Sequence, residues 1–217
     1  KYICASMKHN IWYEFKNHHW EEDEDGVGLQ ESLTNEICSL FVDKMHEHKH
    51  AYLNLTEEEE NKKNMLIKNI RKNYLVTMKC RTNKHKKNIM NEAKIIFLDR
   101  QLTQKLNDNP YLLGFKNGVY DLKEKVFRDG KPDDYISLCT NIDYIPFDKS
   151  DANQQKIMDE IDDFMMKLFQ DEELRAYMWE HAASCLTGVQ VNQSFVIYTG
   201  RGANGKSKFL NLINKCL

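Results

Sequence analysis

The spacing of apolar residues predicts a short β-structured start followed by helices. Two aromatic and apolar runs at 2–7 and 11–15, separated by Lys-His-Asn, predict a β-hairpin. The acidic stretch at 17–26 is interpreted as an exposed connection. From Leu29 the apolar residues recur every three or four positions, which predicts an amphipathic helix to about residue 48.

Two more helices are predicted between residues 56 and 97. Thr56 and Glu59 have the spacing of a capping box, in which each side chain bonds the other residue's backbone amide. The face expected to be buried in the first helix holds Ile67, Ile70, Tyr74 and Met78, and that of the second holds Ile89, Met90, Ala93, Ile96 and Phe97.

After Pro110 the pattern becomes typical of short strands and turns. Residues 119–122 and 125–127 are predicted to pair as a small hairpin, and Asn117-Gly118 is a turn dipeptide. Ile136 and Leu138 indicate one more short strand.

Helical spacing returns at about residue 150. One helix begins at Ser150 or Asp151, a second is capped at Asp171 and ends near Gly188, and a strand is predicted at 194–200. The buried residues expected in the two helices are Ile157, Ile161, Phe164, Met165 and Leu168, then Leu174, Tyr177, Met178, Ala182 and Cys185.

Composition narrows the class of protein. A chain of 217 residues with 41% hydrophobic residues forms one large domain or two small ones. Its six cysteines are scattered without a C-x-x-C pair, which favours reduced thiols and an intracellular protein over a disulfide framework or a zinc site. No apolar run is long enough for a membrane span. The chain opens on "KYICASMKHN" without a Met, so we interpret it as an internal piece of a longer protein.

The strongest chemical motif is "GRGANGKS" at 200–207, which matches G-x-x-x-x-G-K-[ST]. Glycines allow the backbone to curl so that several amides face one phosphate group, and the helix that follows adds its positive end. Lys206 is the predicted catalytic contact to the β- and γ-phosphates of ATP, and Ser207 the predicted Mg²⁺ ligand. The predicted nucleotide contacts are Gly200, Arg201, Gly202, Ala203, Asn204, Gly205, Lys206 and Ser207. The alternative is an ordinary glycine-rich turn.

Charge is distributed unevenly, although the formal net charge is only -2. Residues 62–94 hold eleven Lys or Arg and a single acid, Glu92. One interpretation is that these residues contact DNA phosphates. The other is a solvated helix face whose positive charge balances the acids at 57–60. The candidate DNA contacts are Lys62, Lys63, Lys68, Arg71, Lys72, Lys79, Arg81, Lys84, Lys86 and Lys87.

Two other clusters are assigned to structure rather than chemistry. Alternate histidines in "HEHKH", residues 46–50, point to different sides of a helix, which disfavours a metal site. Trp12, Tyr13, Phe15 and Trp20 are able to stack on bases, but alternating aromatics in a hairpin are more typical of a core.

With these motifs in view, the chain resembles superfamily 3 helicases. The loop is similar to their G-x-x-x-N-G-K-S form, with Asn204 before the last glycine. "LLGFKNGVYDL" at 112–122 and "WYEFKNHHW" at 12–20 are similar to the pre-helicase region of primase-helicases from poxviruses, giant DNA viruses and some phages. The resemblance implies ATP-driven unwinding of single-stranded or forked DNA in replication by a homo-hexamer, with a primase domain upstream in the same chain. It also implies the viral replication site in the host cytoplasm.

The predicted fold is α+β: a helix-rich domain with small β-hairpins, then the first strand, loop and helix of an AAA+-like ATPase core. The predicted divisions are a pre-helicase domain at 1–150, a helical connector at 151–188 and the start of the ATPase core at 189–217. Because Walker B acids, a sensor and an arginine finger have no counterpart here, we expect this segment alone to hydrolyse ATP poorly. The alternatives are a non-catalytic module for single-stranded DNA or ring assembly, and a P-loop kinase or GTPase. The latter is disfavoured because the loop comes so late in the chain.

Overall fold

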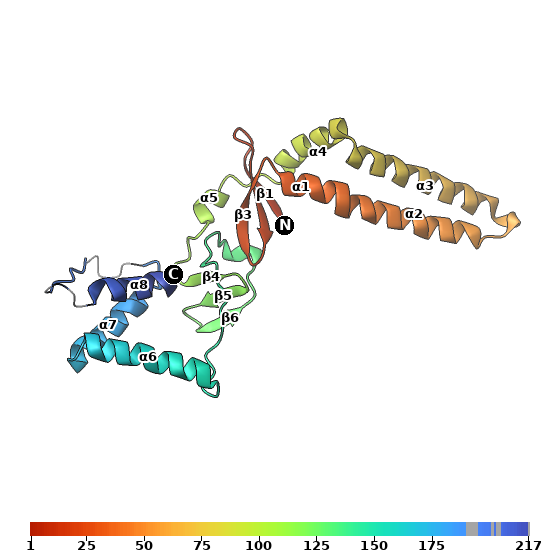
Figure 1. The fold of residues 1–217 in the computed structure, drawn as a ribbon. Helices are drawn as coiled ribbons and strands as arrows, with labels where there is room; N and C mark the ends of the chain where they lie inside the picture. Colours follow the sequence, from red (N-terminus) through yellow and green to blue (C-terminus); the bar gives the residue numbers. More distant parts are fainter. Residues whose placement is uncertain (190–194, 201, 203–204, 217) are drawn as a thin grey trace. The chain divides into compact units, whose positions relative to one another are not determined.

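The computed structural model describes residues 1–189, 195–200, 202 and 205–216. Its described part is α+β, helix-rich, with two small antiparallel sheets (Figure 1). The chain divides into two compact units: unit 1 comprises Lys1–Phe15 and Glu21–Gln104, and unit 2 comprises Lys16–Trp20 and Lys105–Leu217. This general fold class agrees with the prediction.

The first sheet consists of β1 (Tyr2–Ser6), β2 (Ile11–Lys16) and β3 (His19–Glu24), in that order. The predicted hairpin is confirmed, since β1 and β2 are antiparallel with Cys4 opposite Trp12. The predicted connection at 17–26 is wrong, because most of it is β3. Asn17 and His18 both have positive φ (48° and 68°), as in the tight turns whose twist matches that of paired strands. The chain therefore reverses direction at residues 17–18 and continues directly as β3.

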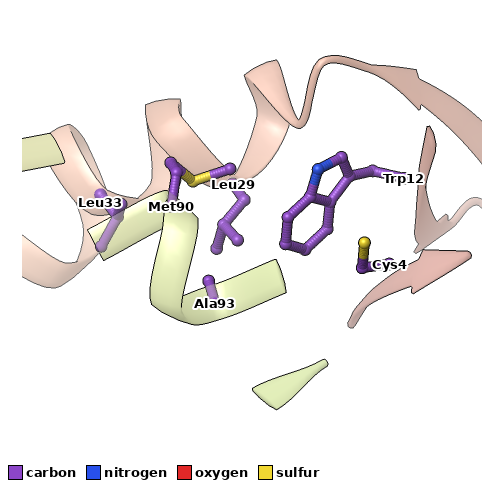
Figure 2. Close-up of a cluster of buried hydrophobic side chains, with 6 residues drawn as sticks. All are labelled: Cys4, Trp12, Leu29, Leu33, Met90 and Ala93. Atoms are coloured by element: carbon purple, nitrogen blue, oxygen red, sulfur yellow. The ribbon is translucent and has the colours of Figure 1, made fainter. Parts of the chain in front are cut away.

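Unit 1 has a core in which the sheet meets helices α1 (Val27–Ser32) and α4 (Asn83–Ile96) (Figure 2). Trp12 from β2 is 0% exposed, and its indole N–H donates to Asn10 Oδ1 at 3.1 Å. Trp20, which belongs to unit 2, is also buried, and its indole N–H donates to the Pro132 carbonyl. The assignment of these tryptophans to cores is confirmed. The buried members of this core are Cys4, Trp12, Leu29, Leu33, Met90 and Ala93.

The predicted helix from Leu29 is confirmed and continues further than expected. Helix α1 runs through the π-helical turn η1 (Leu33–Ile37) into α2 (Cys38–Leu53). After the 3₁₀ turn η2 (Glu57–Glu59), α3 (Glu60–Arg81) returns alongside α2 (Figure 1). The predicted capping box is present, with the Thr56 amide donating to the Glu59 carboxylate at 3.4 Å. We call α2 and α3 the helical hairpin.

The buried face of α3 differs from the prediction. Tyr74 and Met78 are 54% and 45% exposed, whereas Thr77 and Cys80 are 4% exposed. The Thr77 hydroxyl donates to the Asn73 carbonyl, and the Cys38 thiol of α2 donates to the Thr77 carbonyl. Small side chains with satisfied hydrogen bonds thus fill the space between α2 and α3. The buried face of α3 is therefore the one that carries Thr77 and Cys80, not the one that carries Tyr74 and Met78.

In α4 the prediction is partly correct. Met90 and Ala93 are buried, but Ile96 and Phe97 are 73% and 42% exposed. Helix α4 ends at Ile96, so the last two apolar positions lie where the helix stops and no longer follow its buried face.

Unit 2 begins with a small sheet after the short helix α5 (Leu102–Lys105), which spans the boundary of the units. Strands β4 (Leu112–Phe115), β5 (Gly118–Asp121) and β6 (Val126–Arg128) form an antiparallel meander in that order. The predicted hairpin is confirmed, with Tyr120 opposite Phe127. Rings from the sheet pack with Tyr144, whose ring stacks on Phe127 at 4.6 Å between centroids.

The predicted strand at Ile136 and Leu138 is wrong. Residues 135–140 follow the 3₁₀ turn η3 (Pro132–Asp134) without strand structure, and Leu138 is 71% exposed. The Asn107 side chain accepts hydrogen bonds from the Ser137 and Leu138 amides at 2.9 and 3.2 Å. A side chain therefore satisfies backbone groups that a strand would satisfy with a neighbouring strand.

Two helices follow as predicted, α6 (Ala152–Leu168) and α7 (Glu172–Ser184). Asp151 caps α6 by accepting from the amides of Asn153 and Gln154, and Asp171 caps α7 through the Leu174 amide. Met165 and Met178 are buried as expected. Four expected core residues are exposed instead: Ile157, Leu174, Tyr177 and Cys185.

Candidate nucleotide-binding site

The candidate site lies where the chain enters α8 (Lys206–Cys216). Gly205, just before the helix, has φ +79°, a left-handed conformation that favours glycine. A Cβ on this residue would also lie 2.6 Å from Leu168 Cδ1 of α6. Two features therefore favour glycine at position 205: the left-handed backbone conformation and the close approach of the Leu168 side chain.

Lys206 and Ser207 occupy the first turn of α8, where backbone N–H groups have no partner within the helix. The Lys206 ammonium donates to the Gly200 carbonyl at 3.3 Å, so it reaches the residue at the other end of the loop. A helix N-terminus with a lysine beside it is favourable for a phosphate group. The residues that the structure describes here therefore fit the predicted ATP phosphates.

The predicted site is only partly covered by the structure. Gly200, Gly202, Gly205, Lys206 and Ser207 are described, and an added Cβ on Gly202 would meet nothing within 4 Å. Arg201, Ala203 and Asn204 lie outside the described residues. Lys206 is brought close to Gly200, and Ser207 lies exposed at the start of the helix.

The strand predicted before the loop is not found. Residues 195–200 have no strand structure, Phe195 is 84% exposed and Ile197 is 70% exposed, while Ser194 lies outside the described residues. A strand needs a neighbour to accept and donate its backbone hydrogen bonds. Within the described ranges no segment pairs with 195–200, which explains the difference.

A cluster of buried residues supports both sides of the loop. Phe209 of α8 is 3% exposed and packs with Met165 of α6 and Met178 of α7. Tyr198, which precedes the loop, contacts the Phe209 ring edge-on at 6.1 Å between centroids. The residues that flank the candidate loop, Tyr198 and Phe209, therefore pack together against α6 and α7. Helical spacing correctly indicated that Leu168 is an inward position, but no signal in the spacing shows that it touches Gly205.

The predicted DNA-binding residues lie on α3 and α4 of unit 1. Three of them contact neighbours: Lys62 pairs with Glu59, Lys63 lies over the Tyr52 ring, and Lys86 donates to the Thr34 hydroxyl. The other seven are exposed and form no ion pair within the part of the chain that the structure describes: Lys68, Arg71, Lys72, Lys79, Arg81, Lys84 and Lys87.

Within the described ranges, no group of three or more His, Cys, Asp or Glu side chains could hold a metal ion. No helix in them is both long and apolar enough to cross a bilayer.

Comparison with known proteins identifies the family. Residues 1–171 match the family model described as D5 N terminal like. A protein of Acanthamoeba polyphaga mimivirus named as a candidate helicase is 36% identical over 219 residues, covering 100% of this chain and 22% of that protein. The chain therefore belongs to the D5 N terminal like family, and the resemblance to viral primase-helicases is confirmed at the level of family.

More distant relatives carry related names. A candidate helicase of Invertebrate iridescent virus 3 is 33% identical over 119 residues, covering 55% of this chain and 12% of that protein. A candidate primase of African swine fever virus is 22% identical over 134 residues, covering 59% of this chain and 13% of that protein. The chain spans less than a quarter of the length of each of these three relatives.

Proposed function

We propose that this chain is part of a viral replicative helicase-primase and that residues 200–207 bind ATP with Mg²⁺. The observation that carries the proposal is the arrangement of Gly205, Lys206 and Ser207 at the N-terminus of α8, with the Lys206 ammonium reaching Gly200. Family membership and the names of the relatives support a role in the replication of viral DNA.

Each residue has a distinct proposed role. Lys206 places its positive charge on the β- and γ-phosphates, and the Ser207 hydroxyl is a ligand of Mg²⁺. The metal, when bound, neutralises charge on the phosphate oxygens. The amides at the start of α8 complete the anion site. In the full-length protein we propose a homo-hexamer on single-stranded or forked DNA, with a primase domain in the same chain, at the viral replication site in the host cytoplasm.

A fluorescent ATP analogue tests this proposal on the 217-residue chain with Mg²⁺ present. We expect Lys206→Ala to weaken binding by about tenfold or more, because an ion-phosphate contact in a phosphate loop contributes more than one kcal/mol. The matched control is Lys208→Ala, an exposed lysine two residues further along the same helix. It should change affinity by less than about twofold. Equal binding by wild type and Lys206→Ala would contradict the assignment of the loop.

A non-catalytic role in binding single-stranded DNA is the second candidate for this segment. The observation that favours it is the set of seven exposed cations on α3 and α4 that form no ion pair with any residue the structure describes. The two functions are compatible, since one describes the loop and the other the helical hairpin.

A further inference from the structure

The net positive charge of the helical hairpin lies on one of its two helices. No acid occurs from residue 61 to residue 91, a stretch that contains ten Lys or Arg. Helix α3 holds seven Lys or Arg and one Glu, whereas α2, packed along it, holds two Lys and two acids. Helix α2, with no net charge, thus packs along the strongly basic helix α3.

The structure sorts the side chains of α3 into two faces. Thr77 and Cys80 face α2, so residues on the opposite side point to solvent. On that side, helical spacing places Lys68, Lys72 and Lys79 in one row, with Arg71 and Leu75 beside it. Tyr74 and Met78 follow the edge of the same face. We call these seven residues the outward face of α3.

Cations and large apolar side chains share this face. Tyr74, Leu75 and Met78 are 54%, 59% and 45% exposed, and the four cations have no ion-pair partner in the described ranges. A phosphate chain with flat bases satisfies both kinds of group, because cations contact phosphates and aromatic rings stack on bases. A helix that lies on a membrane separates its cations from its apolar face, and here they are mixed.

We propose that the outward face of α3 binds single-stranded DNA. Lys68, Arg71, Lys72 and Lys79 contact phosphates, and a base stacks on the Tyr74 ring. The row from Lys68 to Lys79 extends over ~16 Å of helix at 1.5 Å per residue, enough for a few nucleotides. The inference rests on the proposed function in its choice of DNA as ligand, but it does not involve the nucleotide loop.

The test is the binding of a fluorescent oligothymidine by anisotropy, without ATP, between 50 and 200 mM salt. We expect the double variant Lys68→Ala/Lys79→Ala to bind several-fold more weakly and to reduce the slope of log K against log salt by about 1.4, or ~0.7 per phosphate contact. The matched control is Lys44→Ala/Lys49→Ala on α2, which removes the same charge from the other helix. It should leave the slope unchanged.

The stacking role of Tyr74 is tested separately. Tyr74→Ala should weaken binding about fivefold or more at every salt concentration without changing the slope, and Tyr74→Phe should restore it. All substituted side chains are exposed, and circular dichroism checks that each variant is folded. Equal effects of the α2 and α3 double variants would overturn the proposal, as would binding of polyglutamate in place of DNA. Loss of DNA binding with intact nucleotide binding, or the reverse, separates this inference from the proposed function.

Discussion

Asp134 links the second sheet to the loop that follows it. Its carboxylate accepts two hydrogen bonds from the Arg128 guanidinium of β6, at 2.7 and 2.8 Å, and one from the Lys131 amide at 2.7 Å. Burial alone would raise the pKa of Asp134, but the hydrogen bonds from Arg128 and Lys131 outweigh burial and hold that pKa below its ordinary value of 3.8. The ionised form is therefore the one that stabilises the fold.

Replacing Asp134 with Asn should lower the free energy of unfolding by about 1–2 kcal/mol at pH 6, since charged hydrogen bonds are lost from a partly exposed pair. The stabilisation by Asp134 is fully present above its ordinary pKa and disappears as pH falls through the lower pKa of the folded state. Urea unfolding at pH 6 and at pH 2–3 should therefore show a difference between wild type and variant that shrinks with acid. The control is Asp133→Asn, because Asp133 is the exposed neighbour of Asp134. A difference that stays constant with pH would exclude this role.

At the scale of elements, the end of α6 forms a support for the candidate nucleotide loop. Leu168 lies against Gly205, and Phe169 contacts the Phe209 ring edge-on at 5.6 Å between centroids. The C-terminal end of α6 therefore contacts the chain where α8 begins. This arrangement makes the position of the loop dependent on packing of α6.

We expect Leu168→Ala to weaken binding of the ATP analogue several-fold, because the backbone around Gly205 loses the side chain that holds it. Leu168→Met, which refills the space, should restore most of the affinity. The control on the same helix is Ile157→Ala, whose side chain is 56% exposed. If Leu168→Ala binds the analogue as well as wild type does, Leu168 has no positioning role.

At the scale of the whole molecule, each unit has its own cluster of buried side chains. One surrounds Trp12 in unit 1, and the other joins α6, α7 and α8 around Met165 in unit 2. No residue belongs to both clusters. The stability of each unit is therefore set mainly by its own core.

Trp12→Ala tests this division. Removing a fully buried indole should cost about 3–5 kcal/mol within unit 1. Hydrogen exchange followed by mass spectrometry should show faster exchange in β1, β2, α1 and α4, with little change in α6–α8. Equal acceleration in α6–α8 would show that the two clusters unfold together.

How far the fold is predictable depends on the range of the interactions that form each element. The caps at Asp151 and Asp171 and the pairing of β5 with β6 were predicted correctly, because each depends on residues within a few positions. Strand β3 and the irregular segment at 135–140 were missed. The segment at 135–140 depends on Asn107, about 30 positions away. Strand β3 is the exception, because its turn at Asn17 and His18 is local but lacks the glycine that usually marks such a turn.

The amino-acid sequence by itself determined the candidate site residues, the family and the charge of α3, because motif spacing and composition are local properties. Only the tertiary structure decided that Leu168 touches Gly205 and that Thr77, rather than Tyr74, faces α2. Both contacts depend on how separate helices pack. A helical repeat shows that a residue lies on a face, and the packing partner decides which face is buried.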